Sequence, residues 1–246
     1  MAVIAVYSVK GGVGKTTLAV DLAWRCATVG QHSTLLWDLD VQGGSGFLLD
    51  RPPPDRARAI TAFLPGGKPH KLVTATRYAG LDLLPGDASL RELPVELARL
   101  GAGKRLRKRC KALAKHYERI VLDCPPMMNE VSEQVMRAAD LIILPLPPSP
   151  LSARAMAQVR EELVRQGKHP PLLPVLSMYD SRRKLHHAAR EGFAKGWPVI
   201  PASTWGEQVA ARRAPLPTFA NWSDTAKAME RLWKAAERKL KELGKT

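Results

Sequence analysis

The chain has 246 residues, of which 45% are hydrophobic and 25% charged, so it is long and apolar enough to bury one sizeable core. Lysine and arginine number 38 against 23 acidic residues, and the formal net charge is +15. This composition excludes a low-complexity chain. The positive excess favours a polyanionic partner, either nucleic acid or an anionic membrane surface.

The cysteines and the N-terminal residues indicate in which cellular compartment the protein is found. Cys26, Cys110 and Cys124 are odd in number and lack paired metal-ligand spacing, so we expect reduced thiols in the core. The N-terminus lacks the basic stretch, apolar segment and cleavage site of a secretory signal. No apolar run approaches the ~20 residues that would cross a bilayer. We therefore expect a cytoplasmic protein.

Apolar, strand-like runs alternate with helical patterns along the chain. We expect strands at residues 2–6, 33–39, 81–84, 119–122, 141–146 and 172–178, and helices at residues 15–29, 88–100, 104–117, 152–166, 181–194 and 223–243. Nearly continuous apolar strands indicate burial on both faces, which is typical of a parallel sheet between helices. The sequence thus predicts one doubly wound, mostly parallel α/β domain over residues 1–246.

Two proline-containing segments interrupt this alternation. Residues 51–67 contain a run of prolines and a pair of glycines, and we expect them to form a loop around a short helix. Residues 145–150 follow a predicted strand and contain four prolines, so we expect a stiff, extended connection there.

A glycine-rich segment lies between the first predicted strand and the first predicted helix. It reads Lys10-Gly11-Gly12-Val13-Gly14-Lys15-Thr16-Thr17. Glycines let the backbone approach a polyphosphate, and the amides at a helix N-terminus point toward the anion. Lys15 would reach the β- and γ-phosphates, and the Thr16 hydroxyl would bind Mg²⁺. The usual loop has glycine where Val9 stands, and Lys10 is an additional lysine ahead of the glycines.

Acidic residues follow two other predicted strands. Asp38 and Asp40 end the second strand at alternate positions, which point the same way, and Asp123 ends the strand at residues 119–122. Ligands of such sheets bind beyond the carboxyl ends of the strands, so we expect these carboxylates beside the glycine-rich loop. One carboxylate can position magnesium while another orients an attacking water.

These segments resemble the three signatures of the ParA/MinD ATPases, whose phosphate loop is a deviant Walker A motif. The resemblance rests on residues 10–17, on Asp38-Leu39-Asp40-Val41-Gln42-Gly43 and on Leu122-Asp123-Cys124-Pro125-Pro126. Residues 178–182 and 199–201 also resemble family segments in order and spacing, so the resemblance covers nearly the whole chain. The family commonly has proline where this chain has Val41, a difference that alters the rigidity of the turn.

The resemblance implies an ATP-dependent sandwich dimer in which Lys10 crosses to the partner's phosphates. A cation placed there stabilises the charge that develops during phosphoryl transfer. By motif position, the implied catalytic residues are Lys10, Lys15 and Asp40, with Asp40 orienting the water. The implied ligands of ATP are residues 10–17, with Met178 and Pro201 walling the adenine, and the implied ligands of Mg²⁺ are Thr16, Asp38 and Asp123.

The resemblance also implies that basic residues in the C-terminal half bind DNA. In such ATPases these residues form one continuous surface for nonspecific double-stranded DNA when ATP joins two subunits. The candidates in this chain are Arg182, Arg183, Lys184, Arg190, Lys195, Arg212 and Arg213. The chain starts directly at its first strand, so we expect no N-terminal helix-turn-helix module and no sequence-specific binding.

The implied function is spatial partition or positioning. A nucleoid-associated ATPase of this type responds to a ParB-like or other cargo adaptor, which stimulates its slow hydrolysis. The cargo is a plasmid, a chromosome or a large protein assembly.

Two alternatives stay open. A membrane-cycling ATPase of the MinD kind would lay the apolar face of the last predicted helix, with Met229, Trp233 and Leu240, on anionic lipid. Such a stripe more often packs on the protein's own core. A metabolic or redox relative, such as the nitrogenase iron protein, would need cluster-ligating cysteines, whereas Cys26 and Cys110 fall in helical patterns.

Overall fold

The computed structural model describes residues 1–54, 58–101, 103–167 and 170–245. Within these residues, eight strands form one sheet in the order β3-β4-β2-β5-β1-β6-β7-β8. All neighbouring strands are parallel except β3, which runs antiparallel to β4. The strands are β1 (Ala2–Val6), β2 (Thr34–Asp38), β3 (Thr74–Ala75), β4 (Leu81–Leu84), β5 (Arg119–Asp123), β6 (Leu141–Leu146), β7 (Leu172–Tyr179) and β8 (Val199–Pro201).

Helices connect the strands and cover the sheet. They are α1 (Lys15–Thr28), α2 (Gly44–Leu48), α3 (Leu93–Arg99), α4 (Arg105–Leu113), α5 (Glu130–Ala138), α6 (Pro150–Arg165), α7 (Lys184–Glu191), α8 (Thr204–Arg212), α9 (Pro217–Ala220) and α10 (Asp224–Glu242). Three short 3₁₀ turns span Ala59–Ala62, Pro69–Leu72 and Ala88–Glu92.

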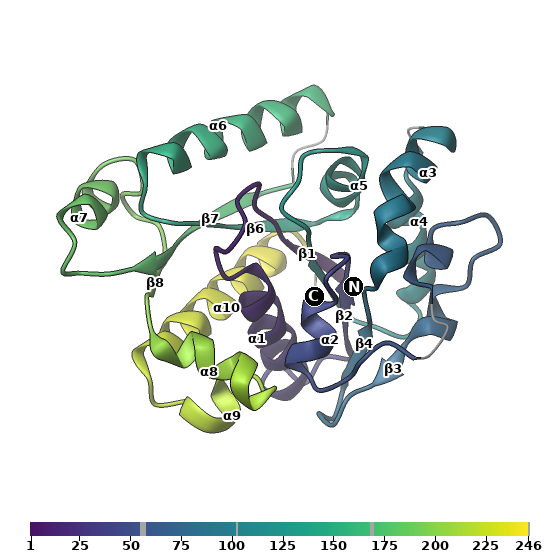
Figure 1. Cartoon of the computed structure of the whole chain (residues 1–246), viewed down its shortest axis with the longest axis horizontal. Helices are drawn as coiled ribbons and strands as arrows, with labels where there is room; N and C mark the ends of the chain where they lie inside the picture. The colour runs from purple at the N-terminus through teal and green to yellow at the C-terminus, as the bar shows by residue number, and fades with distance from the viewer. Residues whose placement is uncertain (55–57, 102, 168–169, 246) are drawn as a thin grey trace.

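The helices form two layers, one on each face of the sheet (Figure 1). Side chains of α3, α4, α5 and α6 pack in one apolar core with alternate residues of the central strands. Side chains of α1, α2, α8, α9 and α10 share a second core with the other set of alternate residues. Because both faces of β1, β2 and β5 are covered, these strands are buried along their whole length. The predicted fold class is therefore confirmed.

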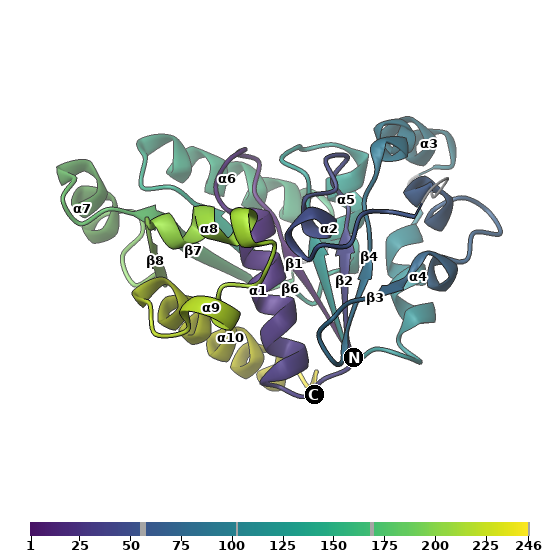
Figure 2. The same cartoon turned by 60° about the horizontal axis from the view of Figure 1, so that its bottom comes forward.

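The parallel strands bring three functional loops to one end of the sheet. The carboxyl ends of β1, β5 and β2 lie side by side, because Val6 pairs with Asp123 and Asp123 pairs with Asp38. Figure 2 shows these ends pointing away from both chain termini. The loops after the three strands therefore meet at this end, where the sequence predicted the site.

The predicted strands and helices occur with shifted ends, and the differences have local causes. The helix predicted at residues 88–100 is divided into a 3₁₀ turn and α3, and the one at residues 104–117 ends at Leu113. The extended connection predicted at residues 145–150 is wrong at both ends, since β6 includes Pro145 and α6 begins at Pro150. Proline is favoured at the first position of a helix, where its missing N–H needs no partner.

Several short elements were not predicted. They are α2, α5, α8, α9, β3 and β8, none longer than nine residues. The start of α5 does have a signal, because the side chains of Asn129 and Ser132 form a capping box. Part of the segment predicted as a loop around a short helix, residues 55–57, lies outside the described residues, and its remainder contains the 3₁₀ turn Ala59–Ala62.

The last helix packs on the core. The apolar residues of α10 are buried against α1 and the sheet, with Leu232 at 1%, Ala236 at 0% and Leu240 at 0% exposure. This face is not available to lipid in the structure, which removes the observation that favoured a membrane-cycling ATPase. Among the residues that the structure describes, no helix is both long and apolar enough to span a bilayer.

Candidate functional site

The glycine-rich loop joins β1 to α1 and leaves an open concave space. Gly12 and Gly14 have φ angles of 68° and 82°, a left-handed conformation that glycine adopts at little cost. No heavy atom lies within 4 Å of a Cβ built on Gly11, Gly12 or Gly14. Since Gly14 caps α1, this space lies at a helix N-terminus. Such a cradle fits a polyphosphate.

Lys15 lies beneath this loop. It is the first residue of α1, is 7% exposed, and its Nζ donates a hydrogen bond to the Lys10 carbonyl at 2.9 Å. Burial lowers the pKa of Lys15, and the charges of Asp123 and Asp40 oppose this shift. A buried amine that is bonded to the loop backbone and feels the charge of two carboxylates is well placed for an incoming anion.

Asp38 and Asp123 are adjacent and buried at the ends of β2 and β5. Their strands pair in register at these two residues, which are 0% and 1% exposed. Asp38 accepts hydrogen bonds from the backbone N–H groups of Asp40 and Ser45, both at 2.9 Å. The Ser45 hydroxyl donates to Asp123 Oδ2, also at 2.9 Å. Ser45 therefore holds the two carboxylates side by side.

This carboxylate pair is incompletely satisfied. Burial raises the pKa of both groups, and the charge of Asp123 raises the pKa of Asp38 further. Hydrogen bonds with Ser45 and Thr16 counter the rise for Asp123. Among the described residues, Asp123 Oδ1 is buried with no hydrogen-bond partner. An orphaned carboxylate oxygen beside the Thr16 hydroxyl fits a hard cation such as Mg²⁺.

Protein side chains alone do not complete a cation site. In the described parts of the chain, no three His, Cys, Asp or Glu side chains gather closely enough to hold a metal ion. Magnesium is usually bound through one or two carboxylates together with substrate phosphates and water. The donors available to it are thus Thr16 and Asp123, with Asp38 behind them.

Asp40 lies outside the strand, contrary to the prediction that it alternates with Asp38 on β2. The strand ends at Asp38, and Asp40 occupies the following turn, where its carboxylate accepts the Gln42 N–H at 3.0 Å. Asp40 is half-buried whereas Asp38 is fully buried. The turn reverses the chain toward Ser45, so the two carboxylates have different surroundings and Asp40 stays accessible to water.

Gly86 fixes the position of this turn. A Cβ at Gly86 would lie 2.4 Å from the Asp40 carbonyl oxygen and 3.1 Å from Asp38 Cγ. The chain after β4 therefore packs directly against the backbone between the two aspartates. Only glycine permits so close an approach.

The Lys10 side chain contacts helix α6 of its own subunit. Its Nζ donates a hydrogen bond to the Ser152 hydroxyl at 3.2 Å, and Ser152 in turn donates to the Pro147 carbonyl at 2.6 Å. Partial burial lowers the pKa of Lys10. Ser152 lies at the start of α6 and is 0% exposed, so Lys10 is anchored to a rigid element.

A cavity of about 540 Å³ lies beside the phosphate loop. Its lining includes Gly12, Gly14, Thr17, Met178, Pro201 and Arg182. Met178 has a φ of 58°, unusual for a side chain of its size, and is 48% exposed. The structure thus brings the two residues predicted to wall the adenine next to the predicted phosphate loop. The volume is in the range of small-molecule sites.

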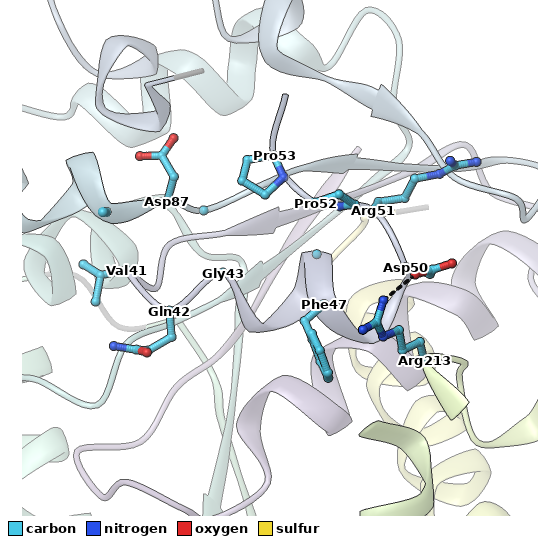
Figure 3. Close-up of a pocket in the computed structure, with 13 residues that line it drawn as sticks. Val41, Gln42, Gly43, Phe47, Asp50, Arg51, Pro52, Pro53, Asp87 and Arg213 are labelled. Carbon is cyan, nitrogen blue, oxygen red and sulfur yellow. Dashed lines mark hydrogen bonds and ion pairs between the residues drawn. The ribbon is translucent and has the colours of Figure 1, made fainter. Parts of the chain in front are cut away.

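A second cavity, of about 470 Å³, lies beside the turn that follows Asp40 (Figure 3). Phe47 and Asp50, from α2 and the chain that follows it, face Arg213 there. The Arg213 guanidinium lies 4.8 Å from the Phe47 ring centroid and pairs with Asp50 at 3.0 Å. Arg213 therefore ties the end of α8 to the segment after β2.

The seven basic residues predicted to bind DNA are not one patch. Five lie on α7 and its flanking loops, and the others, Arg212 and Arg213, lie at the end of α8. Arg182 and Arg183 both pair with Asp180, at 2.9 and 3.6 Å. Arg182 also lines the cavity beside the phosphate loop. Lys184 and Lys195 are exposed and are the freer candidates for a polyanion, whereas Arg183 is exposed but lies 3.6 Å from the Asp180 carboxylate.

The sequence did not identify Ser45, Gly86 or Ser152. Ser45 follows the acidic turn and Gly86 follows β4, so both lie at the carboxyl ends of strands, a position that could have marked them. Ser152 lies in the first turn of α6, 142 residues away from Lys10, and no local pattern connects the two.

Comparisons with known proteins agree with this geometry. A family model described as an AAA domain matches residues 1–169. The chromosome partitioning protein ParA of Myxococcus xanthus is 32% identical over 77% of this chain and 69% of its own. The chromosome-partitioning ATPase Soj of Thermus thermophilus is also 32% identical, over 88% of this chain and 84% of its own.

A solved structure extends the likeness to the fold. Cobyrinic acid a,c-diamide synthase from Mycobacterium smegmatis, with a bound ATP analogue and magnesium, superposes with a TM-score of 0.79. The two chains are 26% identical, and the alignment covers 97% of this chain and 94% of the other.

We predict that Asp123→Asn stabilises the nucleotide-free protein by roughly 1–3 kcal/mol, because it removes a buried and partly unpaired charge. The raised pKa means that the folded state holds its proton above the ordinary value of 3.8. Between pH 3.8 and about 6, the free energy of unfolding of the wild-type protein therefore falls as the pH rises. The extra stability of Asp123→Asn over wild type should grow across the same pH range. Thermal unfolding at several pH values, with and without Mg-ATP, measures both effects. A variant that Mg-ATP stabilises as much as wild type would contradict a metal-linked Asp123.

We also predict that Gly86→Ala displaces the turn between Asp38 and Asp40, because the new Cβ would overlap the Asp40 carbonyl. The expected loss is about 1–3 kcal/mol of folding free energy, together with weaker binding of Mg-ATP. Gly103→Ala is the matched control, since its Cβ would meet nothing closer than 3.9 Å. Equal unfolding midpoints for the two variants would refute the close approach.

Proposed function

Because the chain belongs to the ParA family of P-loop ATPases, we propose that it binds Mg-ATP, pairs with a second copy around the nucleotide, and then holds DNA nonspecifically. Residues 1–246 act as one ATPase domain in this proposal. Hydrolysis is slow until a partner accelerates it. The biological outcome is partition or positioning of a cargo, as the names of the similar Myxococcus and Thermus proteins indicate for those proteins.

The ATPase proposal is supported most strongly by one observation: the glycine-rich loop lies beside the buried carboxylate pair. The Lys15 amine is bonded to the backbone of the glycine-rich loop, and Asp38 and Asp123 lie at the ends of neighbouring strands beside that loop. A buried cation next to two buried carboxylates with raised pKa values is typical of a functional site. The orphaned oxygen of Asp123 gives the arrangement an unfilled ligand position.

We propose particular positions for the cofactors. Residues 10–17 would hold the phosphates, and the cavity with Met178 and Pro201 would hold the base. Thr16 and Asp123 would hold magnesium, which neutralises phosphate charge when bound. Asp40 would orient the attacking water from its half-buried turn, which is the accessible position of the three aspartates.

Lys10 is the residue that we propose links nucleotide binding to dimerisation. Its contact with Ser152 is a single hydrogen bond of a partly exposed amine, so it can be exchanged for a phosphate. A lysine that crosses to the partner's nucleotide would supply positive charge to the transition state, as an arginine finger does. The amine would then leave Ser152.

DNA retention follows from dimerisation in this proposal. A monomer presents the exposed cations near α7 once, and a dimer presents them twice on one assembly. Doubling the phosphate contacts raises affinity and steepens its dependence on salt. The protein would be cytoplasmic and associated with the nucleoid, and a ParB-like or other cargo adaptor would release it by stimulating hydrolysis.

A metabolic activity has less support. The Mycobacterium smegmatis synthase is 26% identical, below the 32% of the two partitioning proteins. The strong positive charge of this chain also suits a polyanion better than a small metabolite.

We predict that Lys10→Ala binds ATP nearly as well as wild type but hydrolyses it about 10²–10³-fold more slowly and dimerises poorly, because one transition-state cation is lost. Sedimentation with a non-hydrolysable analogue measures dimerisation, and phosphate release measures turnover. Ser152→Ala is the control, because it removes the acceptor in the same subunit and keeps the lysine. An analogue-induced dimer of normal stability in Lys10→Ala would exclude the trans contact.

We predict that Arg183→Glu with Lys184→Glu weakens ATP-dependent DNA binding and lowers the salt slope of the affinity by about 2 per subunit. Nucleotide affinity should be unchanged, because neither residue lines the cavity beside the phosphate loop. Fluorescence anisotropy of a labelled duplex over about 50 to 200 mM salt gives the slope. An unchanged slope would place the ATP-dependent DNA surface elsewhere.

A further inference from the structure

A second strongly basic surface lies on helix α4, at the opposite edge of the sheet from α7 (Figures 1 and 2). Four lysines on α4 and its flanking turns are exposed, and they recur at spacings of four, three and four residues. They are Lys104, Lys108, Lys111 and Lys115. Residues three and four apart share one face of a helix, so at least the first three form a single stripe. We call these four residues the α4 lysine stripe.

The lysine stripe has no counter-charge. Within the described residues, none of its amines lies within ion-pairing distance of a carboxylate. Two carboxylates on neighbouring helices are engaged elsewhere: Glu96 pairs with Arg99, and Glu133 pairs with Arg137 and Arg165. Like charges at this spacing repel one another and destabilise a helix.

Two of the three arginines of α4 differ from its lysines in what they contact. Arg105 donates to the Leu100 carbonyl at 3.1 Å, and Arg109 donates to the Leu64 carbonyl at 2.7 Å. These two residues bind the surrounding loops and are half-buried. The lysines make no such contact with any described residue, so structural support of the helix does not account for them.

The charge is also placed unfavourably for the helix itself. Lys104 is the N-cap of α4, and the first turn contains no acidic residue. Cations at the positive end of the helix dipole are unfavourable. The neighbouring 3₁₀ turn, Pro69–Leu72, packs beside α4 and adds exposed Lys68 and Lys71 to the same surface. A surface that concentrates positive charge at the expense of stability suits an anionic ligand.

We propose that the α4 lysine stripe binds the phosphate backbone of duplex DNA, as a second contact that does not require ATP or dimerisation. Lysine is a common phosphate contact in nonspecific DNA binding, whereas it is depleted in protein–protein interfaces. The large apolar residues of α4, Leu106 and Leu113, are buried together with Cys110, so the helix offers no large apolar side chain to a lipid surface.

The inference rests on the proposed DNA binding but is independent of its gating by ATP. In this arrangement α4 supplies weak, constant affinity that keeps a monomer near DNA between cycles. The surface near α7 supplies the additional contacts of the dimer. The two surfaces lie at opposite edges of the sheet, so each can be altered separately.

The test compares Lys108→Glu with Lys111→Glu against a control of equal charge change, Lys227→Glu with Lys241→Glu on α10 and its end. Both control residues are exposed lysines outside the stripe. Binding of nucleotide-free protein to a labelled duplex of arbitrary sequence is measured by anisotropy over about 50 to 200 mM salt. We expect the α4 variant to lose about tenfold or more in affinity and about 2 in salt slope, and the control to lose much less.

Each alternative outcome has a defined meaning. Equal affinity and slope for the α4 variant and the control would overturn the inference. Loss of binding to phosphatidylglycerol vesicles without loss of DNA binding would overturn it in favour of a lipid surface. Thermal unfolding midpoints show whether each variant is folded. If the glutamate variant is unfolded, Lys108→Gln with Lys111→Gln replaces it. Removing the like charges of the stripe should not lower the unfolding midpoint.

The same assay separates this inference from the proposed function. If ATP leaves the affinity of the wild-type protein for DNA unchanged, the proposal that dimerisation controls DNA binding is refuted. The salt slopes measured without nucleotide still show whether α4 contacts DNA. If ATP raises affinity equally in wild type and in the α4 variant, and the nucleotide-free slopes are also equal, only the α4 contact fails.

Discussion

The burial of two carboxylates at the ends of neighbouring strands is the constraint on which the site depends. Asp38 and Asp123 lie in register, shielded from water, and Ser45 bridges them. Burial raises the pKa of both carboxyl groups, and the charge of a neighbouring aspartate raises each further, so the charged pair is unfavourable without a bound cation. The nucleotide-free protein is thus held in a less stable state that a bound cation would relieve, so folding and ligand binding are coupled through this pair.

The backbone around the pair limits how that state can relax. Gly86 packs against the turn between Asp38 and Asp40, and a Cβ at Gly44, the first residue of α2, would lie 3.1 Å from Thr16 Cγ2. The carboxylates therefore cannot turn outward to water without moving β4 and α2. Arg213 adds a further restraint, since it ties the segment after α2 to the end of α8. Movement of the acidic turn would consequently reach α8, which borders the cavity beside the phosphate loop.

Much of the fold could be predicted because its signals are local. Apolar strands buried on both faces and a glycine-rich turn before a helix are readable in a single sequence, and together they place the site at one end of the sheet. Contacts between distant segments are not readable. Lys10 meets Ser152, and Ser45 meets Asp123, only because the sheet brings β1, β2, β5 and α6 together. Asp40 was misplaced because alternation was assumed to continue beyond the last residue of β2.

The amount of charge could be read from the sequence, whereas the position and pairing of the charged groups could not. The sequence gives a net charge of +15 but not its placement, and attention to the C-terminal half missed α4. Arg182 and Arg213 are paired with carboxylates, whereas the lysines of α4 pair with no carboxylate in the described part of the chain. Paired guanidinium groups must lose a partner before they contact phosphate, and free amines need lose only counterions. The number of unpaired cations on a surface is therefore a better guide to DNA binding than the number of basic residues in a segment.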